Sequence, residues 1–141
     1  MESVTRMDKK EGFPKTERLS LEKDIETLFR KGKGFNVYPF RVVSNVRHGD
    51  EKSTCRVLIS VSKKRFHHAV KRNRIKRLVR ESWRRNKMPL IEFCTEHNIT
   101  LNVALIYTAT VIHSYEELSR KLKKVVKEII SRHEGHQTNP S

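Results

Sequence analysis

The sequence predicts an α+β fold, a sandwich in which a sheet of about four strands carries helices in the order α-β-β-β-α-β-α. Two kinds of periodicity point to this class. Apolar residues recur at helical spacing in residues 20–32, 63–87 and 114–130, and they alternate with polar residues in the segments between. The chain has 141 residues, enough for one domain with a modest core. We expect residues 13–133 to form that domain and residues 134–141 to be a C-terminal tail.

The N-terminal part predicts a tail followed by a helix. Residues 1–12 mix charges without periodicity and are expected to be a disordered tail. Ser20 is a candidate N-cap and Gly32 a candidate stop. The acids Glu22 and Asp24 suit the first helical turn. Four apolar residues share one side of this helix: Leu21, Ile25, Leu28 and Phe29.

Alternation predicts strands after this helix. The strand at residues 35–46 has two sets of side chains: Tyr38, Phe40 and Val42 on one face, and Val37, Arg41 and Val43 on the other. Pro39 indicates an edge strand or an irregular start. The polar residues 48–53 predict a hairpin loop. Residues 55–62 predict another strand, half-buried on one side, with the small hydroxyls of Ser60 and Ser62 on the other.

The C-terminal half predicts a buried strand and a last helix. Pro89 ends the preceding helix, and residues 90–97 suit a further short helical turn. Residues 99–108 carry apolar side chains on both faces, which favours a central strand. Ser114 and Glu117 form a capping box for the last helix. Its predicted core stripe is Tyr115, Leu118, Leu122, Val125, Val126, Ile129 and Ile130.

The strongest functional signal is the basic segment 63–87. It holds 12 Lys or Arg residues and one acid, Glu81, so 11 of the formal 15 net positive charges lie there. One side of the predicted helix carries Ile75, Leu78, Val79, Ser82 and Trp83. The opposite side carries a line of Asn73, Arg77, Arg80 and Arg84, with Lys76 beside it. Like charges at this spacing repel unless a polyanion relieves them, so we interpret the line as a polyanion-binding surface rather than an ordinary solvated face.

Composition limits the classes of binding partner and the cellular compartment that we expect for the protein. A pI near 10.2 with clustered positive charge favours nucleic acid over an anionic membrane. The longest apolar runs are far shorter than the ~20 residues of a membrane-spanning helix, and we expect no membrane partner. Cys55 and Cys94 are far apart in sequence, which predicts free thiols in a reducing compartment. Residues 1–13 lack a signal-peptide pattern, and we expect a cytoplasmic protein.

The sequence offers no recognisable catalytic set. Cleaving a nucleic acid takes carboxylates that converge on metal ions, or a paired general acid and base. His67 and His68 are the one tempting pair, but adjacent residues on a helix do not face each other. A self-sufficient nuclease using either histidine is kept as an alternative. His133 and His136 lie near a C-terminus expected to fray, so we expect no catalytic residue, metal or cofactor on the protein itself.

Two segments, Val61–Lys64 and Ala69–Glu81, resemble the Arg-Asn-Arg signature of the bacterial ribonuclease P protein subunit. Arg18-Leu19, Phe29 and Gly32 also resemble the family in order and spacing, as does the strand ending Val57-Leu-Ile-Ser-Val-Ser62. The resemblance covers roughly residues 13–130. It implies a left-handed crossover from Cys55 to Tyr107, where the general rule gives a right-handed one.

The resemblance also implies a function. The protein would be one subunit of a ribonucleoprotein endonuclease whose catalytic RNA cuts the 5′ leader from precursor tRNA, with Mg²⁺ bound largely by the RNA. One protein per RNA is expected, and the protein alone is expected to be inactive. A ribosomal-type or RNA-chaperone protein without processing activity is the alternative, because it would share the charge and the lack of catalytic groups.

Individual roles follow from the same resemblance. The residues expected to contact RNA are Lys63, Lys64, Arg65, Arg72, Asn73, Arg74, Lys76, Arg77, Arg80 and Arg84. Those expected to line a cleft for the single-stranded leader are Ile25, Phe29, Phe40, Arg41 and Val43. Family members often carry aromatic residues at Ile25 and Val43, so weaker base stacking is expected here. The segment from Phe66 to His68 replaces a small, Gly-containing one, which leaves the entry to the basic helix open.

Overall fold

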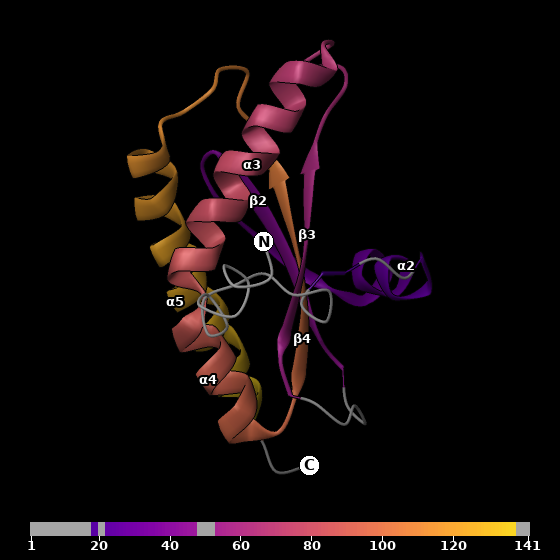
Figure 1. The fold of residues 1–141 in the computed structure, drawn as a ribbon. Helices are drawn as coiled ribbons and strands as arrows, with labels where there is room; N and C mark the ends of the chain where they lie inside the picture. The colour runs from indigo at the N-terminus through magenta and orange to yellow at the C-terminus, as the bar shows by residue number, and fades with distance from the viewer. Residues whose placement is uncertain (1–17, 20–21, 48–52, 138–141) are drawn as a thin grey trace, which may run out of the picture.

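The computed structural model describes residues 18–19, 22–47 and 53–137 (Figure 1). Its elements are α2 (Glu22–Lys31), β1 (Lys33–Val37), β2 (Phe40–Arg47), β3 (Cys55–Val61), α3 (Ala69–Asn86), α4 (Met88–His97), β4 (Thr100–Tyr107) and α5 (Tyr115–Gln137). The α+β class is confirmed, and the order of elements is the predicted one with a further helix, α4, between α3 and β4. The predicted N-cap, Ser20, lies outside the described residues, as do the N-terminal tail and Leu21.

A four-stranded mixed sheet forms the middle layer, with strand order β1-β2-β4-β3. β4 pairs antiparallel with β2 and parallel with β3, so the prediction of a central strand is confirmed. The hairpin predicted between β2 and β3 is wrong, because β4 lies between these two strands. Most of its predicted loop, residues 48–52, lies outside the described residues. The left hand of the crossover from β3 through α3 and α4 to β4 stays a prediction.

The predicted strand at residues 35–46 is two strands. Tyr38 and Pro39 form a turn, and β1 folds back on β2 so that Val37 lies opposite Phe40. The turn interrupts the alternation on which the prediction depended. Val37 therefore packs toward the same core as Phe40, whereas Tyr38 is 58% exposed.

The two faces of the sheet are covered unequally (Figure 1). α3, α4 and α5 lie on one face and close the main core, in which Phe40, Trp83, Leu105 and Leu122 are fully or almost fully buried. Among the described elements, only α2 lies on the other face. A small second core joins it to the sheet through Leu19, Leu28, Val43 and Ala104. The described elements therefore cover this second face only in part.

The helices after the basic segment follow the sequence pattern. α4 is a ten-residue helix where a short turn was expected, and Asn98, the residue that caps its C-terminal end, adopts a left-handed conformation. The hydroxyl of Ser114 accepts a hydrogen bond from the Glu117 amide at 3.2 Å, which confirms the cap of α5. α5 continues to Gln137, so residues 134–137 of the expected tail are helical.

Candidate nucleic-acid interface

α3 is amphipathic in the predicted orientation. Ile75, Val79, Ser82 and Trp83 are buried against the main core. Ser82 is tolerated there because its hydroxyl donates a hydrogen bond to the Leu78 carbonyl oxygen at 2.8 Å. The face opposite these residues is free to meet solvent or a ligand.

That exposed face gathers the predicted cationic line. Asn73, Arg74, Arg77 and Arg80 are exposed, and Lys76 is half-buried beside them. Val70 joins Asn73, Lys76, Arg77 and Arg80 around a shallow hollow of about 370 Å³. Among the described residues, the side-chain amide of Asn73 makes no hydrogen bond with another group of the protein, so this side chain is available to a ligand.

The lone acid of the segment orients one arginine. Glu81 accepts two hydrogen bonds from Arg84, from Nε at 3.2 Å and from Nη2 at 2.6 Å, and Arg85 lies 3.6 Å away. The Arg84 hydrogen bonds hold the pKa of the Glu81 carboxyl below its ordinary value. Arg84 is therefore fixed by a two-pronged ion pair, with 16% of its side chain exposed.

An arginine of the Arg-Asn-Arg segment holds the loop before α3 in place. Lys63, Lys64 and Arg65 form an exposed turn. Arg72 donates from Nη1 to the carbonyl oxygens of Phe66 and His67, both at 2.8 Å. This structural use of Arg72 was not apparent from the sequence. Part of the guanidinium that was expected to contact RNA holds the loop instead.

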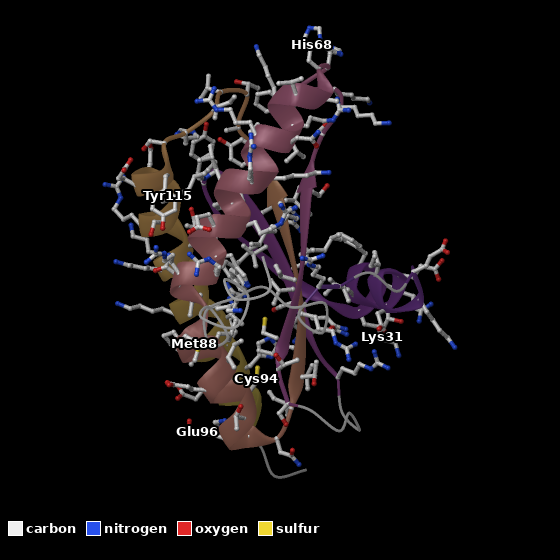
Figure 2. All side chains as sticks on the ribbon, in the orientation of Figure 1. Lys31, His68, Met88, Cys94, Glu96 and Tyr115 are labelled. Atoms are coloured by element: carbon white, nitrogen blue, oxygen red, sulfur yellow. The ribbon has the colours of Figure 1, made fainter. Side chains whose placement is uncertain are left out.

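Phe66 resolves the entry to α3 that the sequence left open. Its ring is buried and lies 6.2 Å from the Tyr107 ring, centroid to centroid. The two histidines that follow are exposed, and His68 stands at the N-terminal end of α3 (Figure 2).

Lys87, counted with the basic segment, lies at the C-terminal end of α3 and is only 1% exposed. Its charge therefore does not contribute to the exposed cationic surface.

α2 is anchored to the other face of the sheet by charge and packing. Asp24 accepts hydrogen bonds from Arg47 on β2 at 2.5 Å and from Arg56 on β3 at 3.4 Å. Leu28 is fully buried in the second core. These contacts leave Phe29 48% exposed and Ile25 half-buried, beside the uncovered part of the sheet.

The structure corrects two of the five predicted cleft residues. Phe40 is 1% exposed and packs edge-on against Tyr107 in the main core, on the face away from α2. Val43 does face α2 but is 6% exposed, because it lies under the helix in the second core. Neither side chain is available to a ligand.

Arg41 stays a candidate for this face. It is exposed, and its neighbour across the strands is Ile106, which in turn pairs with Ser60. Ser60 and Ile106 are half-buried. Arg41, Ile106 and Ser60 form a row across the sheet. Together with Ile25 and Phe29 of α2, they make a partly exposed surface with one cation and several apolar side chains.

Two other potentially reactive groups, Cys94 and His133, are buried or hydrogen-bonded within the fold. Burial raises the pKa of the Cys94 thiol to about 12, which keeps it protonated. His133, placed by sequence in a fraying end, lies in α5 and is hydrogen-bonded to Ser44 Oγ at 3.0 Å. Within the described ranges, no group of three or more His, Cys, Asp or Glu is arranged to hold a metal ion, and no helix is long and apolar enough to cross a membrane.

Comparison with known proteins gives consistent matches. A family model described as Ribonuclease P matches residues 13–130. The ribonuclease P protein component of Porphyromonas gingivalis is 41% identical over 113 residues, 80% of this chain and 82% of that protein. The component from Chlorobium phaeobacteroides is 33% identical over 127 residues, 82% of this chain and 86% of the relative. The solved RNase P protein of Thermotoga maritima has a TM-score of 0.62 at 26% identity, covering 79% of this chain and 96% of the other.

Proposed function

The chain belongs to the ribonuclease P protein family, and from this premise we propose how its two exposed faces divide the work of that enzyme. Its role is that of the protein subunit, which acts with the ribonuclease P RNA in a ribonucleoprotein endonuclease. The comparisons do not favour the alternative of a ribosomal-type or chaperone protein.

The face of α3 is proposed to bind the catalytic RNA. The observation that carries this is the row of Asn73, Arg77 and Arg80 exposed on one side of a helix whose other side is buried in the core. Phosphates would neutralise these repelling charges, and arginine can donate two parallel hydrogen bonds to one phosphate. Lys63, Lys64 and Arg65 extend the same positive surface past the N-terminal end of α3.

The surface beside α2 is proposed to hold the 5′ leader of precursor tRNA. Phe29 offers an exposed ring for an unpaired base, and Arg41 offers a cation for the leader backbone. The two surfaces lie on different sides of the sheet, so the protein can touch the catalytic RNA and the substrate at once (Figure 1).

Three further points belong to the same proposal. The Mg²⁺ ions that assist cleavage are proposed to be bound largely by the RNA, as the family resemblance implies. One protein acts with each RNA, and the complex works in the cytoplasm. The contribution of the protein is positioning and charge screening rather than chemistry at the scissile bond.

Reconstitution tests this function. The protein is mixed with a bacterial ribonuclease P RNA and a precursor tRNA at limiting Mg²⁺, and release of the leader is followed on a gel. We expect cleavage at the mature 5′ end to accelerate on adding protein, because its cations screen the RNA. Binding without any gain in correct cleavage would favour the chaperone alternative.

A further inference from the structure

A second hollow, of about 440 Å³, lies between α3 and the start of α5. Leu78 and Tyr115 supply its apolar part, and four arginines of α3 together with Glu81 supply the rest. The sequence pattern assigned Tyr115 to the core stripe of α5. The structure leaves it half-buried on the first turn of α5, on the side of the molecule away from Lys31 and α2 (Figure 2).

The position of Tyr115 is fixed by its neighbours. The hydroxyl of Ser114 caps the first turn, and its carbonyl oxygen accepts the Leu118 amide at 3.0 Å. Leu118 is fully buried, and Asn86 of α3 donates a hydrogen bond to Ser119 Oγ of α5 at 2.9 Å. The backbone that carries the ring is thus already joined to α3, so binding requires little ordering of the main chain.

The lining combines two kinds of chemistry. The Tyr115 ring and the Leu78 side chain give an apolar surface on which a flat ring can stack. The surrounding guanidinium groups suit phosphates. Glu81 keeps its negative charge among them, and that charge disfavours a phosphate directly above it but tolerates a neutral base. A base between two phosphates matches this arrangement better than a run of phosphates alone.

We propose that this hollow binds one unpaired nucleotide of the catalytic RNA, with its base stacked on Tyr115 and its flanking phosphates on the arginines of α3. The inference rests on the proposed function of the α3 surface and extends it to α5. Tyr115 would then contact a base, whereas the arginines of α3 contact only phosphates.

Affinity for a bacterial ribonuclease P RNA, measured from about 50 to 200 mM salt, tests the inference. Tyr115→Leu keeps an apolar side chain and removes the ring. We expect it to weaken binding by about fivefold to 150-fold, the range for one lost stack, without changing the slope of affinity against salt. Tyr115→Phe should bind like the parent. Tyr38→Leu, which removes an exposed tyrosine outside the hollow, is the matched control and should also bind like the parent.

The outcomes separate the two levels of the proposal. If the parent protein binds the RNA and Tyr115→Leu binds equally well, the nucleotide site is wrong while the proposed function stands. A loss confined to precursor tRNA binding by the assembled enzyme would move the nucleotide to the substrate and overturn its assignment to the catalytic RNA. If the parent itself does not bind the RNA, the proposed function fails, and the nucleotide site with it.

Discussion

The amide of Gly32 donates a hydrogen bond to the carbonyl oxygen of Leu28 at 2.7 Å, and this contact closes the last turn of α2 just before β1 begins. A Cβ atom on Gly32 would collide with that same Leu28 oxygen and lie 2.8 Å from Val43 Cγ1. The helix that carries Phe29 is thus held at a spacing that only glycine permits.

Gly32→Ala should therefore lower the free energy of unfolding by about 1 to 3 kcal/mol, the usual cost of overpacking. Gly34→Ala is the matched control. Its Cβ would meet mainly the flexible guanidinium of Arg41, at 3.0 Å, so we expect a cost below about 1 kcal/mol. Urea unfolding of both variants measures the difference. Equal stabilities would show that α2 can shift away from β2 without cost.

Salt should weaken the complex with the catalytic RNA steeply. If the α3 surface makes about 6 to 10 phosphate contacts, affinity should fall by about 10³ to 10⁵ between roughly 50 and 200 mM salt, through counterion release. Filter binding over this range gives the slope. A flat response would contradict the electrostatic account of α3.

The two histidines before α3 should be dispensable. Both side chains are exposed, and Arg72 holds the loop through the main-chain oxygen of His67, which alanine retains. Changing His67 and His68 together to Ala should leave reconstituted cleavage within several-fold of the parent. Protein without RNA should not cut precursor tRNA in Mg²⁺. Multiple turnovers by protein alone would instead support the self-sufficient nuclease.

Local periodicity predicted the elements of this fold well. The buried side of α3 and the central place of β4 depend on spacing within one segment, and both were correct. The partner of each strand was not predictable in this way. β2 and β3 are successive in sequence, yet both pair with β4, which comes after two helices. Such pairing is set by contacts between distant segments.

The candidate site shows the same division. The spacing of Arg77 and Arg80 was enough to place them on the exposed side of α3. Spacing did not reveal that Arg72 donates to the loop before α3, or that Lys87 at the end of the basic segment is buried. Phe40 was misplaced because the turn at Tyr38 and Pro39 could not be seen as a break between two strands. Charge and spacing therefore located the surface, while tertiary contacts decided which side chains are available.

Arg77 and Phe29 allow the two proposed surfaces to be tested separately. Arg77 is exposed on α3, opposite the buried Ile75 and Val79. Arg77→Ala should leave the thermal melt unchanged, weaken binding to the catalytic RNA, and reduce the salt slope by about one phosphate contact. Normal RNA affinity in this variant would remove Arg77 from the interface.

Phe29→Ala should act on the substrate instead. The side chain is 48% exposed beside the open sheet surface, and a stacked base is worth ~1 to 3 kcal/mol by alanine substitution. The assembled enzyme should bind long-leader precursor tRNA more weakly, and the loss should vanish when the leader is shortened to one nucleotide. Since a half-exposed Phe also contributes to packing, a circular dichroism melt of the same sample is the control. Equal losses for long and short leaders, with the fold intact, would mean that Phe29 does not contact the leader.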